Sequence, residues 1–327
     1  MEVPPELRSV GPLGPTPARR PGSVRRTSTL DMRWPDGAGG RLRIDGRARD
    51  LVTPSDGGSP VVVAEDRLRV GLDPATRTIE EIESTPPRRE LAALVGARGG
   101  GGLRGVLSRV VPDERKAGTP LYLMLDDLSG ASLIAPFALT RWQPESAGDD
   151  QPAEGTCVGF KPGSSALLPA HIAKRSDRTR PVEPLPRPGD PAGWHDLEEI
   201  TEPSTRRARR IDVTLGDVIG VDAMFQDSAT VPSGGRVAVH EYRLEATADP
   251  RTGALLGVRA EPRILPYDEC PLAVLNLDRL LGTPLEDLRT VVPRSLRGTA
   301  GCTHLNDALR ALAEVPALVA ALRSYTA

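Results

Sequence analysis

The chain repeats a series of short landmarks in the same order, and this repetition constrains its fold more than any other feature of the sequence. The matching stretches are Arg25-Arg26 with Arg206-Arg207, Leu30-Asp31 with Ile211-Asp212, Asp73-Pro74-Ala75-Thr76 with Asp249-Pro250-Arg251-Thr252, and Gly118-Thr119 with Gly298-Thr299. Self-similarity along a chain is typical of structural units that recur. We therefore predict an internal duplication, in which two similar folding units follow one another.

Composition separates these two units from the segments around them. Residues 1–24 are rich in proline and lack periodicity, which predicts a disordered tail. Residues 143–205 are rich in Pro, Gly, Ser and acidic side chains, which predicts a long connection. The first unit then covers residues 25–142, and the second covers residues 206–327.

Each unit begins with strand-like alternation of apolar and polar residues and continues with helical spacing. The strand candidates are 27–34, 41–51, 61–71 and 78–83 in the first unit and 210–214, 218–227, 237–247 and 254–261 in the second. The helical stretches are 90–95 and 103–111, then 270–281, 284–296 and 303–323, and 133–142 fits a strand or a helix. This order predicts an α+β fold of two antiparallel β-meanders, each followed by helices and packed together as a pseudo-dimer.

Charge and composition exclude several classes of protein. The net charge is −2, and the basic run at 206–210 has no interleaved aromatic residues, so we expect no nucleic-acid partner. We also expect no membrane partner, because no apolar run approaches the roughly 20 residues that span a bilayer. The 3 cysteines lie far apart and are odd in number, which argues against a disulfide framework and for a reducing, cytoplasmic setting.

The second unit holds four side chains that soft metals prefer. These are His240, Cys270, Cys302 and His304. Two thiols with two imidazoles have the chemistry of a zinc or an iron–sulfur site, although no Cys-x-x-Cys spacing of a zinc finger is present. The sequence therefore gives these four residues as candidate metal ligands.

Cys302 and His304 are also the candidate catalytic residues. If Thr299 caps the last helix, Cys302 lies in its first turn, where the positive end of the helix favours a thiolate. Cys302 would then act as a nucleophile, with His304 or His240 as its base. The alternative is a small buried cysteine that packs at a tight junction, with His304 as a structural histidine. Asp50 and Asp227 recur between the two units, which favours ion pairs or turns over catalysis.

The second unit resembles an uncharacterised bacterial family known only as a domain of unknown function. The residues that carry the resemblance are Cys270-Pro271 before a helix and the ending Gly301-Cys302-Thr303-His304-Leu305. The resemblance implies no activity.

A fainter similarity is to the U-type iron–sulfur scaffold proteins, whose fold is also a meander followed by helices. The stretch from Leu280 to Leu288 resembles theirs, and Cys270 and Cys302 fall near two of their cluster-binding cysteines. The third scaffold cysteine would fall near Ala238, and Gly301 stands in place of a histidine. These departures favour a shared fold over shared cluster assembly.

Three hypotheses of function follow. The first is a metal- or thiol-site domain that binds zinc or an iron–sulfur cluster. The second is a cofactor-free enzyme that acts on a small molecule through Cys302 and a histidine. The third is a structural or interaction protein with a protein partner and no chemistry of its own.

Overall fold

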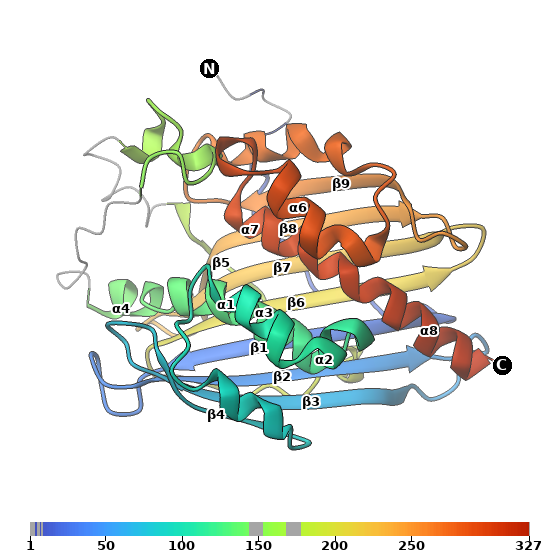
Figure 1. Ribbon diagram of the computed structural model, residues 1–327, viewed down its shortest axis with the longest axis horizontal. Coiled ribbons are helices and arrows are strands. Elements are labelled where there is room, and N and C mark those ends of the chain that lie inside the picture. The colour runs from blue at the N-terminus through green and yellow to red at the C-terminus, as the bar shows by residue number, and fades with distance from the viewer. Residues whose placement is uncertain (1–3, 5–6, 8, 144–152, 168–177, 327) are drawn as a thin grey trace.

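The computed structural model describes residues 4, 7, 9–143, 153–167 and 178–326, which form one nine-stranded antiparallel sheet with helices packed on one face (Figure 1). The strand order is β4-β3-β2-β1-β6-β7-β8, and both β9 and β5 pair with β8. The strands are β1 (Ser23–Arg33), β2 (Leu42–Thr53), β3 (Val61–Leu72), β4 (Ile79–Thr85), β5 (Arg180–Pro181), β6 (Ser204–Leu215), β7 (Ile219–Thr230), β8 (Arg236–Ala248) and β9 (Leu255–Ile264). The α+β class and the antiparallel meanders are therefore confirmed.

The first strands of the two halves meet at the centre of the sheet. β1 and β6 pair antiparallel along their whole length, from Ser23 opposite Thr214 to Arg33 opposite Ser204. Because this pairing is continuous, the two predicted units share a single sheet.

The two meanders also deviate from regular pairing at corresponding places. The pairing of β2 with β3 shifts register between Asp50 and Leu51, and that of β7 with β8 shifts between Asp227 and Ser228. Opposite Asp50 stands Ala64, whereas opposite Asp227 stands His240. The two irregular sites therefore differ in one residue that can bind a metal or a proton.

The helices on this face form two groups, one following each meander in sequence (Figure 1). The first group is α1 (Leu103–Val110), α2 (Pro112–Ala117), α3 (Pro120–Ile134) and α4 (Phe137–Trp142), with the 3-10 helix η2 (Arg89–Leu94). The second is α6 (Leu288–Ser295), α7 (Thr303–Arg310) and α8 (Val315–Thr326), with η8 (Cys270–Leu280), η9 (Leu285–Asp287), η10 (Gly298–Ala300) and η11 (Ala311–Glu314). The shorter 3-10 turns η4 (Val158–Phe160), η5 (Ser165–Leu167) and η7 (Pro191–Gly193) lie between the meanders in sequence. The long helix predicted over 303–323 is thus divided into α7, η11 and α8.

Helix α3 is the central helix of the first group, and the sequence pattern did not predict it. Nearly all of its residues are buried against β1, β2 and β3. A helix buried all round has no polar face, so it lacks the amphipathic period by which a sequence reveals a helix. The span Pro120–Trp142 is long and apolar enough to cross a membrane, but 67% of its most apolar window is buried inside the protein. Its burial is therefore that of a core helix.

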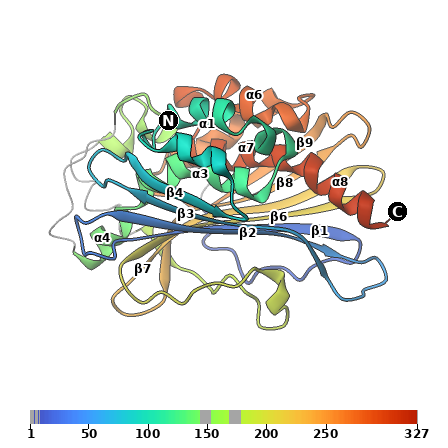
Figure 2. The ribbon, with the colours of Figure 1, turned by 60° about the horizontal axis from the view of Figure 1, so that its bottom comes forward.

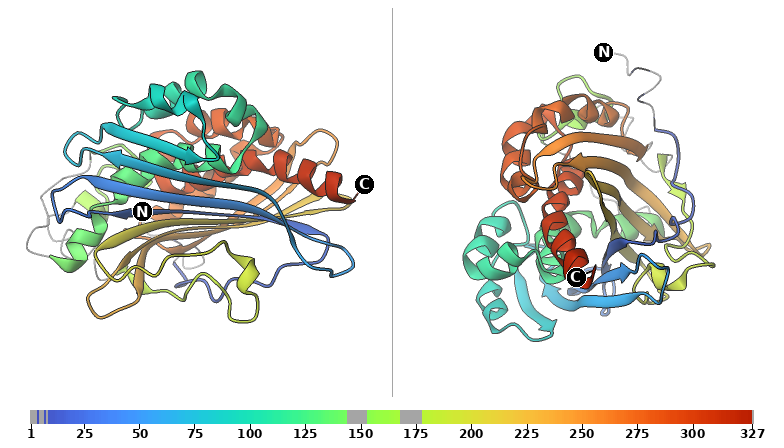
Figure 3. Two further views of the ribbon diagram at one scale, coloured as in Figure 1. Left: turned by 90° about the horizontal axis from the view of Figure 1, so that it is seen from below. Right: turned by 90° about the vertical axis from the view of Figure 1, so that its right-hand side faces the viewer.

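The opposite face of the sheet is covered by extended chain in place of helices (Figure 2, Figure 3). Residues 9–22, which the sequence predicts to be disordered, instead lie along this face of the protein. The backbone N–H of Leu13 donates to Glu241 at 3.2 Å, and Arg19 pairs with Asp190 at 2.7 Å. These contacts give the tail partners that its composition could not reveal.

Part of the predicted connection also lies on this face. The two ring nitrogens of His195 lie 2.9 and 2.8 Å from the hydroxyl oxygens of Thr27 and Thr29 on β1. Since a neutral imidazole has one donor and one acceptor nitrogen, it satisfies both hydroxyls and fastens the connection to the centre of the sheet.

Candidate functional site

The beginning of α7 and the middle of β8 bring the predicted site residues of the second unit together. Alternate residues of a strand share a face, so His240 and Tyr242 of β8 both point toward the helices. Helix α7 begins at Thr303, and Cys302 is its N-cap residue, with an extended backbone (φ −123°, ψ 133°). The prediction that Thr299 caps this helix and that Cys302 lies in its first turn is therefore wrong. The extended cap is what allows both Cys302 and His304 to approach β8.

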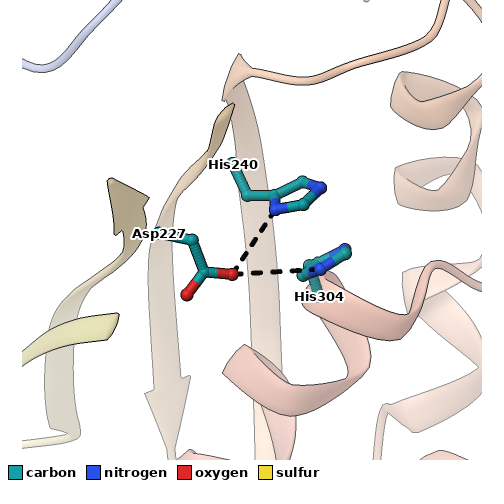
Figure 4. Close-up of side chains that lie close together, drawn as sticks. All are labelled: Asp227, His240 and His304. Atoms are coloured by element: carbon teal, nitrogen blue, oxygen red, sulfur yellow. Dashed lines mark ion pairs between the residues drawn. The ribbon is translucent and has the colours of Figure 1, made fainter. Parts of the chain in front are cut away.

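Asp227, His240 and His304 form a compact group from β7, β8 and α7 (Figure 4). One potential ligand atom from each lies within 4.8 Å of the other two. His240 Nδ1 and His304 Nε2 lie 3.4 and 3.9 Å from the same carboxylate oxygen, Oδ2 of Asp227. The two imidazole rings are stacked, with centroids 3.4 Å apart and planes inclined by 20°. Asp227 and His240 are buried, whereas the His304 side chain is 17% exposed.

The Asp227 carboxylate is held in place by a buried arginine. Arg207 of β6 donates to both of its oxygens, Nε to Oδ1 at 2.9 Å and Nη2 to Oδ2 at 3.0 Å. A third nitrogen of Arg207 donates to Asp307 of α7 at 3.2 Å. Burial by itself raises the pKa of Asp227, but Arg207 and His240 outweigh it and hold this pKa below its usual range. The carboxylate is therefore ionised at neutral pH.

Helix α3 makes room for this arginine at Gly130. A Cβ atom on Gly130 would overlap the guanidinium group of Arg207 and would lie 2.7 Å from its Cζ atom. Glycine is unfavourable inside a helix, so its presence in α3 has a steric reason. The orientation of Asp227 thus depends on a helix of the other half of the chain.

The three cysteines of the chain gather in a second buried cluster beside this group. Cys270 and Cys302 are joined there by Cys157, which comes from the predicted connection. A Cβ atom on Gly159 would lie 2.9 Å from the sulfur of Cys270 and 3.7 Å from that of Cys157. A side chain at position 159 would therefore displace the Cys270 thiol, whereas the contact with Cys157 would be an ordinary one.

The environment of the thiols favours their neutral form. Burial and the neighbouring Cys157 thiol raise the pKa of Cys302 to about 11, against the N–H groups of Leu305 and His304 that lower it. Burial likewise raises the pKa of Cys270 well above its usual value. The N–H groups at the start of α7 lower the pKa of Cys302, but burial raises it by more. At neutral pH these side chains are thiols, which are poor nucleophiles.

The predicted ligand residues are therefore distributed over two neighbouring clusters. His240 and His304 lie together with Asp227, whereas Cys270 and Cys302 lie together with Cys157. Among the residues that the structure describes, the group close enough to hold one ion contains no cysteine. The sequence pattern does not identify Asp227 as a ligand, because its recurrence as Asp50 favours an ion pair. It does not identify Cys157 either, because that residue lies in a segment with no recognisable pattern.

Residues 205–318 match the model of a family described as a protein of unknown function, DUF2889. This match confirms the resemblance to an uncharacterised family and includes both clusters, apart from Cys157. It assigns no chemistry to them. No curated protein and no solved structure matches the chain.

Proposed function

We propose that the second half of the chain binds a divalent first-row transition metal through Asp227, His240 and His304. The observation that supports this most is the convergence of three ligand atoms within 4.8 Å of one another. Two imidazoles and one carboxylate are the ligand set of many mononuclear iron(II) and zinc sites. With three protein ligands, such a metal keeps open positions for water or a substrate.

The ion pair with Arg207 is compatible with this role. A carboxylate has about four lone-pair sites, so Oδ2 of Asp227 can accept one bond from Arg207 and still face the two imidazoles. Ligating carboxylates are commonly oriented by a hydrogen-bonded partner of this kind. Arg207 also brings a positive charge close to the site, which reduces the affinity for a cation. We therefore expect binding that is specific but weaker than that of a structural zinc site.

The alternative with Cys302 as a nucleophile has less support. Cys302 is only 2% exposed, and burial raises the pKa of its thiol. A reducing, cytoplasmic setting remains part of the proposal, supported by three free cysteines that lie close together without forming a disulfide.

We further propose that the two halves arose by duplication and that the first serves as scaffold. Two ion pairs across the central strands support this, since Arg25 pairs with Asp212 at 2.5 Å and Arg206 pairs with Asp31 at 2.6 Å. Arg26 pairs with Asp50 next to the first irregularity, as Arg207 does with Asp227 next to the second. The first half thus has the arginine–carboxylate pair but has Ala64 where the second has His240.

The test is titration of the metal-free protein with Co²⁺ and Zn²⁺ under anaerobic conditions, followed by calorimetry and visible absorption. We expect one equivalent to bind and the affinity to fall about tenfold or more in His304→Ala and in His240→Ala, since ligand loss removes a coordinate bond. His195→Gln, which removes a histidine on the other face of the sheet, is the matched control and should bind as the native protein does. The proposal is refuted if neither metal binds, or if both histidine variants bind the metal with the affinity of the native protein.

A further inference from the structure

A cavity of about 690 Å³ lies on the face of the sheet away from the metal-site group. Its floor is formed by outward-facing residues of β6 to β9, and its cover by residues 13–18 and 182–185. Figure 3 shows the extended chain that crosses this face. The volume lies within the range of sites for small organic ligands.

Most charged groups of the floor neutralise one another. Arg210 pairs with both Asp212 and Asp222, and Arg243 pairs with Asp222 at 2.5 Å and with Glu245 at 2.8 Å. A ligand charge would therefore have to compete with existing ion pairs at these residues.

Glu241 is the exception among the buried carboxylates of this floor. It is 1% exposed, and its partners are neutral: the N–H of Leu13 at 3.2 Å and the side-chain amide of Gln226 at 3.3 Å. Arg263 acts on it only as a more distant charge and pairs itself with Glu261 at 3.5 Å. Within the described part of the chain, Glu241 thus has no ion-pair partner of its own. A buried carboxylate without an ion-pair partner is stabilised when a cation binds beside it.

The wall beside Glu241 is apolar. Leu185 and Met224 are buried in a small cluster with Trp194, and Leu13 packs against it. Leu13, Leu185 and Met224 all line the cavity. A molecule with one cationic end and an apolar body would fit both the carboxylate and this wall.

We propose that the cavity binds a small organic ammonium ion, with its charged nitrogen at Glu241 and its apolar body against Leu13, Leu185 and Met224. This site is independent of the proposed metal site, because its residues lie on the other face of the sheet. The result of the metal titration therefore does not decide whether this cavity binds an ammonium ion, and a failure of either proposal leaves the other standing.

The test compares two probes of the same length, hexylammonium chloride and 1-hexanol, by ligand-observed NMR and calorimetry on the full chain. We expect hexylammonium to bind at least about tenfold more tightly than hexanol, since a charge-assisted hydrogen bond is the stronger one. Glu241→Gln should remove this difference. Glu245→Gln, at a carboxylate already paired with arginine, is the matched control and should preserve it.

A second variant keeps the test decisive if Glu241→Gln does not fold. Met224 lines the cavity on β7 and belongs to its apolar wall. Met224→Ala should remove part of this wall and weaken the binding of both probes. The proposal is overturned if hexylammonium does not bind, if it binds no better than hexanol, or if its binding is the same in Met224→Ala.

Discussion

Replacing Gly130 with alanine tests the reasoning that links the two halves of the chain to the metal-site group. In an ordinary helix interior, Gly→Ala stabilises by about 1 kcal/mol. In α3 the new Cβ atom overlaps the guanidinium group of Arg207, which is buried and bonded to Asp227 and Asp307. Arg207 must therefore leave its position.

The expected magnitude follows from these opposing effects. Breaking a buried ion pair destabilises a protein by about 3–5 kcal/mol. After the gain in helix propensity, Gly130→Ala should lower the free energy of unfolding by about 2–4 kcal/mol. It should also weaken Co²⁺ binding, because Asp227 loses the partner that orients it.

The assay is urea unfolding followed by tryptophan fluorescence, with Gly105→Ala as the matched control. Gly105 lies in α1, where a Cβ atom would approach no atom closer than 3.9 Å, so this variant should be as stable as the native protein or up to about 1 kcal/mol more stable. If Gly130→Ala proves as stable as Gly105→Ala, the steric role assigned to Gly130 is wrong.

Two further predictions concern titration and reactivity. Burial, followed by Arg49, Arg206 and Arg47, lowers the pKa of His195 to about 3, from 6.5. Its neutral form therefore contributes stability that is complete above pH 6.5 and is lost as the pH falls toward 3, by up to about 1.4 kcal/mol per pH unit. His195→Gln should flatten the stability curve measured between pH 7 and pH 4, and an unchanged slope would contradict the assignment. The thiols Cys157, Cys270 and Cys302 are buried, so iodoacetamide at neutral pH should label them only after unfolding. Rapid labelling of Cys302 in the native protein, located by mass spectrometry, would instead support its role as a nucleophile.

The strands could be predicted from sequence because their signal is local. Alternation of apolar and polar residues depends only on which face of the sheet is buried, and it located all four strands of each meander to within several residues. Helix α3 was missed for the opposite reason, since burial on every side removes the period that marks a helix.

The candidate site shows the same division. The residue types of the site are evident from the sequence, because His240, Cys270, Cys302 and His304 all lie in the second half of the chain. Which of them come into contact depends on the three-dimensional fold. His240 and His304 join Asp227 because the strand order places β7 beside β8 and the extended N-cap of α7 turns His304 toward them. Such contacts join residues that are far apart along the chain, so they depend on strand register and helix packing that no local pattern encodes.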